Sequence, residues 1–376
     1  MKTIRDIQFL EGVPVLVRVD FNVPIKNGEV AEGFRVRMAL PTIDFLASKG
    51  AKIILMSHIE SNADGSNPSL EPVAHYLGAK LGHPVVFVKK YKDAFAEIAR
   101  LQSGGCILLE NVRFFEGEKA NDPKFAKELA SLADIYVNDA FSVSHREHAS
   151  VVGVPKLLPS YAGFQLEKEV LNLSRAFDPA RPFLFILGGA KFETKLPLLE
   201  KFMLIADSVF VGGALANDFF KAKGYETGAS LLSKGDVDLS IYLKNEKLSL
   251  PSDVVLQDRS VKSPDALAKE DKIFDSGPAT VAALSNAIAG SKFVLWNGPL
   301  GMYEGGYTDA TLALAKLIAE ATSKHGVESI VGGGDTLAAI STLGNEDQFT
   351  FISTGGGAML DFLAQGTLPG IEALGS

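Results

Sequence analysis

Several polar side chains in the first half of the chain stand at the ends of short apolar, β-branched runs. They are Asp20 and Asn22 after VPVLVRV, His58 after AKIILMS, Arg113 after CILLENV and Asn138 after ADIYV. Arg35, His145, Arg146 and His148 lie in the loops that follow. Ligands of doubly wound sheets bind at the carboxyl ends of the strands, so these side chains are expected to face one crevice. Any one arginine is usually a solvated charge, but together they would suit a ligand with phosphate and carboxylate groups.

The apolar runs of the second half end in glycine instead. These runs are LFILGG to Gly189, VFVGG to Gly213, FVLWNG to Gly298, IVGGG to Gly334 and FISTGGG to Gly357. Four of them lead directly into helix-like segments, so their glycines lie where a strand turns into a helix. Such turns expose backbone N–H groups that bind phosphate. We therefore expect a second anion site, made of amides, in this half.

Lys191 and Lys195 follow the first glycine pair in the opening turns of the next expected helix. Two cations four residues apart share a helix face, and here they oppose the positive end of the helix dipole. A bound phosphate would relieve that conflict. The alternative is a solvated face whose lysines point at water.

Asp335 and the glycines 355–357 each allow two interpretations. Asp335 follows three glycines and precedes Thr336, so it is either an N-cap or a magnesium ligand beside phosphate-binding amides. Gly355, Gly356 and Gly357 are either tight-turn residues or amide donors. We favour phosphate binding for the glycines, because two such runs that each open a helix are uncommon in one domain.

The alternation of apolar runs, turns and helix-like segments predicts an α/β protein built of βαβ units around parallel sheets. Two domains are expected from the length of 376 residues and because the apolar runs end in polar residues in the first half and in glycine in the second. The segment 158–176 reads as one amphipathic helix that connects them, and FDPARP then ends it.

Composition excludes several classes of protein. Hydrophobic residues make up 47% and charged residues 22%, as in ordinary globular proteins. No apolar run approaches the ~20 residues of a membrane span, and the charged N-terminus lacks a signal-peptide core, so we expect a cytoplasmic protein. The single cysteine, Cys106, and Trp296 are expected in the core. The net charge of -8 disfavours nucleic acid and anionic membranes as partners.

Familiar nucleotide fingerprints are absent from the sequence. It has no GxxxxGK[ST] phosphate loop, no GxGxxG turn and no protein-kinase HRD or DFG motif. A nicotinamide-dependent oxidoreductase is disfavoured by the missing GxGxxG turn.

Eight segments in order resemble the phosphoglycerate kinase family. They are RVDFNVP at Arg18, LMSH at Leu55, LLENVRF at Leu108, NDAFSVSHREHAS at Asn138, LGGAKFETK at Leu187, WNGPLGMYE at Trp296, GGGDT at Gly332 and STGGGA at Ser353. The resemblance covers nearly the whole chain. It implies two Rossmann-like domains with parallel sheets, joined by a long helix, with an open cleft between them.

The resemblance also implies boundaries and a reaction. Residues 1–157 would bind phosphoglycerate, 158–176 would be the connecting helix, 177–362 would bind nucleotide, and 363–376 would pack back on the first domain. The enzyme would transfer a phosphoryl group reversibly from 1,3-bisphosphoglycerate to Mg-ADP, in line and without a phosphoenzyme, giving 3-phosphoglycerate and ATP in glycolysis. The family further suggests a monomer with hinge closure.

By motif position, the resemblance assigns site residues. Substrate would be bound by Asp20, Asn22, Arg35, His58, Arg113 and Arg146, with Ser61 at a further substrate position. Arg35 and Lys191 would be catalytic. Nucleotide would be bound by Lys195, Gly212, Gly213, Asn297, Glu304, Gly333, Gly334, Asp335 and Thr336. Asp335 would also hold Mg²⁺, and the amides of Gly355, Gly356 and Gly357 would stabilise the transition state.

The chain departs from the family at one place. Where the family usually reads SHLGRP, this sequence has Ser57-His58-Ile59-Glu60-Ser61-Asn62, so Ser61 replaces a substrate-binding arginine and Glu60 adds a negative charge. A lost charge-assisted contact costs ~1.5 to 3 kcal/mol, so we expect a raised KM for 3-phosphoglycerate. The same departure supports a rival hypothesis, a nucleotide-binding protein that has lost catalysis. The retained Arg35, Lys191 and Asp335 argue against that rival.

Overall fold

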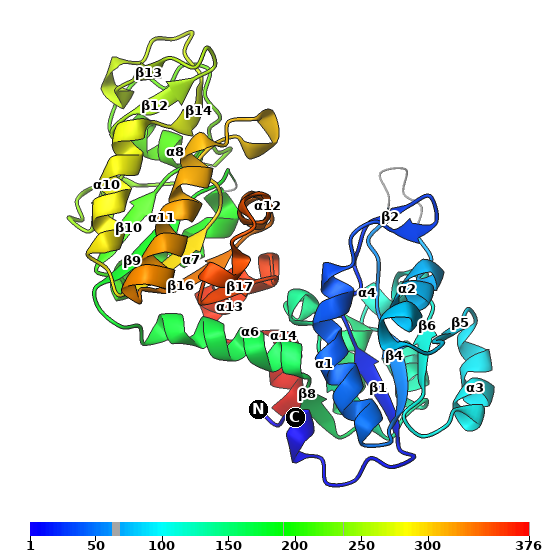
Figure 1. The fold of residues 1–376 in the computed structure, drawn as a ribbon. Coiled ribbons are helices and arrows are strands. Elements are labelled where there is room, and N and C mark those ends of the chain that lie inside the picture. Colours follow the sequence, from blue (N-terminus) through cyan, green and yellow to red (C-terminus); the bar gives the residue numbers. More distant parts are fainter. Residues whose placement is uncertain (62–67, 191, 236, 376) are drawn as a thin grey trace. The chain divides into compact units, whose positions relative to one another are not determined.

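The structure is a computed structural model that describes residues 1–61, 68–190, 192–235 and 237–375. The chain folds into two compact units (Figure 1). Unit 1 comprises Met1–Leu171 and Thr367–Ser376, and unit 2 comprises Asn172–Gly366. Two Rossmann-like α/β units with parallel main sheets were predicted, and this fold class is confirmed.

Unit 1 contains a parallel sheet in the order β5-β6-β4-β1-β7-β8. Its strands are β1 (Pro14–Arg18), β4 (Lys52–Met56), β5 (Val86–Val88), β6 (Cys106–Leu109), β7 (Ile135–Asn138) and β8 (Ser160–Ala162). The central strands are buried on both faces, which explains their continuous apolar runs. A short antiparallel pair, β2 (Ile25–Lys26) and β3 (Glu29–Val30), follows β1.

The helices of unit 1 cover this sheet and complete its core. They are α1 (Phe34–Ser48), α2 (Glu71–Leu81), α3 (Ala94–Arg100), α4 (Glu116–Lys119), α5 (Pro123–Ala130) and α14 (Pro369–Glu372), and α6 (Phe164–Ser174) crosses the boundary to unit 2. Alternate residues of a strand face opposite sides. Val15 and Val17 of β1 therefore share a hydrophobic cluster with Ile43 of α1 and Leu77 of α2.

Unit 2 has a second parallel sheet, in the order β11-β10-β9-β15-β16-β17. The strands are β9 (Phe183–Leu187), β10 (Ser208–Val211), β11 (Leu248–Ser249), β15 (Phe293–Asn297), β16 (Glu328–Gly332) and β17 (Phe351–Ser353). Leu184 and Ile186 belong to one hydrophobic cluster with the fully buried Trp296. The alternate residues Phe183 and Phe185 contact Phe202 on the other face.

The described helices of unit 2 are α7 (Phe192–Ile205), α8 (Leu215–Ala222), α9 (Ser240–Leu243), α10 (Pro278–Ala289), α11 (Asp309–His325), α12 (Gly334–Leu343) and α13 (Gly357–Gln365). Of these, α7, α8, α12 and α13 follow glycine-ended strands, as predicted. A three-stranded antiparallel sheet of β12 (Val254–Leu256), β13 (Val261–Lys262) and β14 (Ile273–Ser276) was not predicted. Its strands are too short to show a clear periodicity in the sequence.

The helix predicted over 158–176 is wrong in its first part. Ser160–Ala162 pairs as β8 with β7, and the α-helix begins only at Phe164. Two side chains of unit 1 fix this start: Thr42 Oγ1 accepts the amide of Phe164, and Asp139 Oδ1 accepts those of Gln165 and Leu166 at 2.8 and 3.3 Å. These side chains are distant in sequence, so amphipathicity alone could not locate the helix start. A 3₁₀ turn, Arg175–Phe177, follows the helix.

The last residues of the chain contact unit 1 (Figure 1, red). Gly370 donates its amide to the carbonyl of Ser144 at 2.8 Å, and Ala373 packs in a cluster with Val143 and Val151. The predicted boundary at 363 differs from the structural one, because α13 continues to Gln365 and the contacts of unit 1 begin at Thr367.

Cys106 is buried and unpaired with any other cysteine, as expected for the single thiol of the chain. Burial raises its pKa far above the ordinary value. Among the described residues, no helix combines the length and the apolar character that crossing a membrane would need.

Candidate active site

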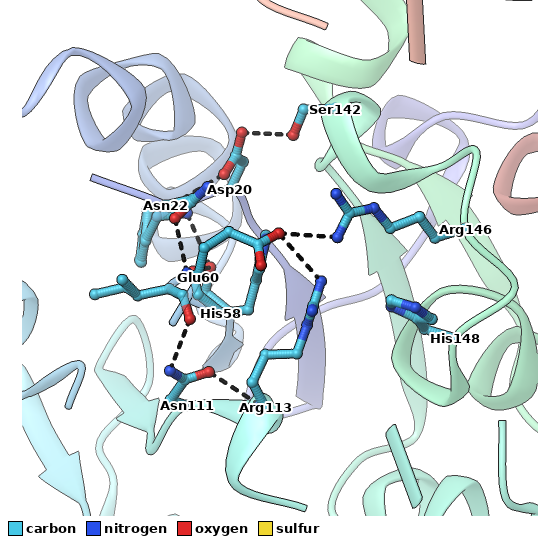
Figure 2. A network of polar contacts seen from close by, with 12 residues as sticks. Asp20, Asn22, His58, Glu60, Asn111, Arg113, Ser142, Arg146 and His148 are labelled. Carbon is cyan, nitrogen blue, oxygen red and sulfur yellow. Dashed lines mark hydrogen bonds and ion pairs between the residues drawn. The ribbon is translucent and has the colours of Figure 1, made fainter. Parts of the chain in front are cut away.

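The carboxyl edge of the unit 1 sheet carries a cluster of charged side chains (Figure 2). Asp20 follows β1 and forms an ion pair with Arg35 at the start of α1. The Ser142 hydroxyl donates to the same Asp20 carboxylate at 2.5 Å. Burial acts to raise the pKa of Asp20, but Arg35 and the other neighbours hold it below its ordinary value. Asp20 is therefore an anion that orients Arg35.

His58 follows β4 and is almost fully buried. Its Nδ1 lies 3.2 Å from Nη2 of Arg18, a group that can only donate. Nδ1 must therefore accept, which leaves the proton of the neutral ring on Nε2. Burial lowers the pKa of His58 to about 4, so the ring is neutral near pH 7 and presents an N–H donor.

Glu60 occupies the centre of this cluster. Its Oε1 lies 2.9 Å from Arg146 Nη1, 3.5 Å from Arg113 Nη2 and 3.7 Å from His58 Nε2. Figure 2 shows the two arginines reaching the Glu60 carboxylate from different elements. These neighbours, His58 foremost, hold the pKa of Glu60 well below its ordinary value. The site thus already binds one carboxylate, supplied by the protein itself.

Two asparagines fix the backbone around Glu60. Asn22 Oδ1 accepts the amide of Glu60 at 3.0 Å. Asn111 Nδ2 donates to the carbonyl of Ile59 at 3.1 Å, and its Oδ1 accepts the amide of Arg113 at 3.0 Å. Asn22 was predicted as a site residue and Asn111 was not. Its position two residues before Arg113, in LLENVRF, was the available signal.

A buried polar network contacts the site through Arg18, which lies next to His58. Arg18 Nε donates to Ser150 Oγ at 2.9 Å, and Ser150 Oγ donates to Glu118 at 2.6 Å. His148 Nδ1 lies 3.8 Å from the Glu118 carboxylate. Arg18 is fully buried at the end of β1, so this carboxylate compensates its charge. The contacts join segments up to 132 residues apart, and no sequence pattern indicates them.

The structure thus places Asp20, Asn22, His58, Arg113 and Arg146 in one polar network, as expected (Figure 2), and Arg35 joins it through its ion pair with Asp20. Ser61 follows Glu60, and its side chain is exposed.

In unit 2, Lys195 lies in the first turn of α7 and is not solvated. Its Nζ donates to the carbonyl of Gly188 at 2.7 Å and to Asn297 Oδ1 at 2.8 Å. Burial lowers the pKa of Lys195 to about 8, and Asp335 opposes that shift. The interpretation of Lys195 as a solvated charge is therefore wrong. Lys191 lies outside the described residues.

Glycines let the turns that follow β9 and β10 approach one another closely. Gly213 follows Gly212 at the end of β10 and has a φ of +63°. A Cβ at Gly213 would lie 2.6 Å from the amide nitrogen of Gly189. Larger residues would separate these turns and remove the backbone surface that they form.

The start of α12 places Gly333, Gly334, Asp335 and Thr336 together. Gly333 is the N-cap, with a φ of +107°, so Asp335 is a first-turn residue rather than the N-cap considered above. Its carboxylate is exposed and lines a cavity, whereas Thr336 is buried and its Oγ1 accepts the amide of Gly298 at 3.1 Å. Asp335 is thus an exposed acid that lines a cavity at a helix N-terminus.

The last glycine run opens α13. Gly356 is the N-cap, with a φ of +54°, and the helix begins at Gly357. The Gly355 amide donates to Ser353 Oγ at 3.2 Å, so it would have to share or exchange this bond before it could bind a phosphate.

A cavity of about 410 Å³ lies beside these turns in unit 2. Apolar side chains such as Phe220, Leu231 and Met302 line one part, and Gly213, Glu304 and Asp335 line another. Buried Asp275 also lines it, with a pKa raised to about 7 by burial. Only the polar rim was predicted, because the apolar wall combines Phe220 of α8 with residues from separate loops. A planar apolar group with a phosphate tail fits this combination.

The donor set at Asp335 suits Mg²⁺. Magnesium prefers oxygen ligands and is usually held by one or two carboxylates together with substrate phosphates and water. The exposed Asp335 carboxylate provides such an oxygen at the rim of the cavity.

Comparison with known proteins gives a consistent result. The family model described as phosphoglycerate kinase matches residues 4–366. The phosphoglycerate kinase of Dictyoglomus turgidum is 44% identical, with 99% of this chain and 98% of that protein covered. The phosphoglycerate kinase structure from Coxiella burnetii has a TM-score of 0.87 at 38% identity, covering 99% of this chain and 98% of the other. That from Pyrococcus horikoshii has a TM-score of 0.84 at 30% identity, covering 100% and 98%.

Proposed function

This chain belongs to the phosphoglycerate kinase family, and from that premise we propose how its two units share the reaction. The chain is a phosphotransferase, and its glycolytic role follows from the family. Unit 1 binds 3-phosphoglycerate or 1,3-bisphosphoglycerate, and unit 2 binds ATP or ADP. The observation that carries this assignment is the convergence of His58, Arg113 and Arg146 on one carboxylate oxygen.

The acceptor site of unit 1 uses donors of two kinds. Arg113 and Arg146 provide permanent positive charge, and neutral His58 provides a fixed N–H donor. Arg35, oriented by Asp20, adds a guanidinium that can reach the transferring phosphoryl group. A small acid with a phosphate and a carboxylate matches this set better than a neutral metabolite does.

The nucleotide site of unit 2 combines an apolar wall with charged and amide donors. The base packs in the cavity of about 410 Å³, with Glu304 near the ribose. Lys195 binds phosphates, Asn297 helps to seat the nucleotide, and the turns at Gly212 and Gly213, Gly333 and Gly334, and 355–357 donate amides. Asp335 would hold Mg²⁺, which neutralises phosphate charge when bound.

Phosphoryl transfer needs positioning and charge stabilisation rather than a strong base. The substrate carboxylate attacks the terminal phosphorus of ATP directly, and ADP leaves. Arg35 and Lys191 stabilise the charge on the phosphoryl oxygens during transfer, and amides at 355–357 add donors. No protein nucleophile takes part, so no phosphoenzyme forms.

Because the two ligands bind different units, transfer requires that the units approach one another. Closure also excludes water from the phosphoryl group. Small-angle scattering should show a smaller radius of gyration with both substrates than with either alone. An unchanged radius would contradict closure.

We further propose a cytoplasmic monomer. Sedimentation equilibrium at micromolar concentration should give the mass of one chain, 40.1 kDa. A dimer mass would contradict that proposal.

A coupled assay with ATP, Mg²⁺ and 3-phosphoglycerate tests the function itself, by following the formation of 1,3-bisphosphoglycerate. Lys191→Ala should abolish turnover. Arg146→Ala should raise KM for 3-phosphoglycerate about tenfold, the effect of losing one charge-assisted contact, and leave KM for ATP unchanged. Turnover that is absent in the wild type despite nucleotide binding would favour the non-catalytic rival or another acceptor.

A further inference from the structure

The Glu60 carboxylate sits where the proposed substrate should bind. Its Oε1 is contacted by Arg146 at 2.9 Å, Arg113 at 3.5 Å and His58 at 3.7 Å. These are the same three donors that the proposed function assigns to the substrate. One anion in such a cluster stabilises the charge of both guanidinium groups, and it occupies the Nη1 donor of Arg146 with a hydrogen bond of 2.9 Å.

Hydrogen bonds fix the backbone of Glu60, whereas its side chain is partly exposed to solvent. The Glu60 amide is held by Asn22, and the preceding carbonyl is held by Asn111. The Glu60 side chain itself is 43% exposed. Rotation about its side-chain bonds can therefore carry the carboxylate into solvent without moving the strand end that positions His58.

We propose that Glu60 is an internal competitor that occupies the acid-binding cluster and sets the affinity of unit 1 for its anionic substrate. This proposal rests on the proposed function, because that function identifies the cluster as the substrate site. Substrate binds after Glu60 rotates out, and the two anions exchange on the same donors. The exchange replaces the hydrogen bond and ion pairs of Glu60 with contacts to the substrate, and no covalent bond is made or broken.

Competition lowers affinity by the fraction of time that the cluster is open. If Glu60 occupies the cluster nine-tenths of the time, the apparent Kd for an external anion rises about tenfold. The weak substrate binding expected from Ser61 thus has a second and separable cause. The substitution Ser61→Arg would add a positive charge that attracts the substrate. Removal of the Glu60 charge would instead remove the carboxylate that occupies the cluster.

Calorimetric titration of the wild type and of Glu60→Gln with 3-phosphoglycerate, without nucleotide, tests the proposal. The amide keeps the size of the side chain and loses the charge. Kd for 3-phosphoglycerate should fall about tenfold in Glu60→Gln, and the Kd for inorganic phosphate, titrated in the same way, should fall by a similar factor. Glu60→Asp, whose shorter side chain reaches the donors less well, should give an intermediate Kd.

The matched control is Glu97→Gln, which removes one negative charge from unit 1 and breaks the exposed pair with Arg100 at 3.0 Å. It should leave Kd and turnover unchanged. A Kd in Glu60→Gln that is unchanged or higher would overturn the proposal, because Glu60 would then be neutral for binding or would position the arginines.

The coupled assay separates this failure from failure of the proposed function. If the wild type turns over while Glu60→Gln shows no gain in affinity for 3-phosphoglycerate, only the competitor proposal fails. If 3-phosphoglycerate neither binds nor reacts in the wild type or Glu60→Gln, the proposed function fails and the competitor proposal falls with it. A gain in affinity for 3-phosphoglycerate without turnover supports the competitor and overturns catalysis.

Discussion

Single side chains in this protein are held in charge states that their neighbours determine. Lys195 is 9% exposed and its ammonium donates to two oxygens, one on Gly188 and one on Asn297. Burial nevertheless lowers its pKa to about 8, because two neutral acceptors replace only part of the lost hydration. Without a bound anion, the protonated and neutral forms of Lys195 therefore coexist slightly above physiological pH.

Nucleotide binding should accordingly depend on the protonation of Lys195. We expect the affinity for Mg-ADP to weaken several-fold between pH 7 and pH 9 as the ammonium is lost, with proton uptake on binding near pH 8. Calorimetry in buffers of different ionisation enthalpy measures both effects. Lys195→Met should bind weakly with a flatter pH profile, whereas Lys201→Met, on the same helix, should behave like the wild type. Equal profiles in Lys195→Met and the wild type would refute this role.

His58 should make the protein less stable in acid. Its pKa falls from 6.5 to about 4 on folding, mainly through burial. Between these values the unfolded chain binds a proton that the folded protein does not, so stability is complete above pH 6.5 and decreases as the pH falls towards 4. The loss attributable to His58 is on the order of 3 kcal/mol.

Urea unfolding at pH 7 and pH 4.5 checks this prediction. The difference in unfolding free energy between the two pH values should be smaller in His58→Gln than in the wild type. It should not vanish, because burial lowers the pKa of His148 to about 4 as well. The exposed His75→Gln is the control and should keep the wild-type difference. If His58→Gln and the wild type showed the same difference in unfolding free energy, His58 would not be the cause of the acid sensitivity.

At the scale of secondary structure, α6 is capped by an acid from another element. Asp139, just after β7, accepts the amides of Gln165 and Leu166 and is 2% exposed. Burial raises its pKa to about 7. The folded protein thus binds a proton that the unfolded chain releases, and this contribution to stability decreases as the pH rises from about 4 to about 7.

Asp139→Asn should therefore remove the decrease in protein stability that accompanies rising pH, and its side-chain carbonyl should still accept the amides at the start of α6. Asp139→Ala should lose the cap and cost about 1 to 2 kcal/mol. Melting temperatures at pH 5 and pH 8 measure both effects. Asp122→Asn, at the exposed N-cap of α5, is the control for capping without burial. If the pH dependence of Asp139→Asn equals that of the wild type, the buried acid is not its source.

At the scale of the whole molecule, the two units are not continuous segments of the chain. The chain leaves unit 1 within α6, builds unit 2, and returns with Thr367–Ser376 to unit 1. Leu368 is fully buried and Leu374 is 6% exposed. Burial of each leucine contributes about 1.5 to 3 kcal/mol, so the last ten residues stabilise a unit that they are far from in sequence.

Deletion of residues 367–376 should lower the melting temperature of unit 1 and separate its unfolding from that of unit 2. Leu374→Ala should do so in part, at a cost of about 2 to 3 kcal/mol. Differential scanning calorimetry resolves the two transitions. Leu204→Ala is the control, since Leu204 is 84% exposed. A single unchanged transition after deletion would mean that the returning segment contributes little.

Much of the fold could be predicted from the sequence, because parallel strands that are buried on both faces appear in it as continuous apolar runs. All nine apolar runs named in the sequence analysis became strands of the two main sheets, since both faces of such strands are covered. The polar residues that end the runs of unit 1 were predicted to meet, because parallel strands bring their carboxyl ends to one edge. The strands β8 and β12 lie outside these apolar runs and were not predicted.

The remaining features depended on contacts between distant segments. Glu60 was recognised in the sequence only as an additional negative charge, and its position among Arg113, Arg146 and His58 follows from three separate strand ends. The Arg18–Ser150–Glu118 network and the capping of α6 by Asp139 arise in the same way. Strand periodicity and turn chemistry are local, so the sequence alone determined the family, the sheets and most of the residues that meet at the carboxyl edges of the strands. Charge state and occupancy depend on what surrounds a group in space, and only the tertiary structure decided them.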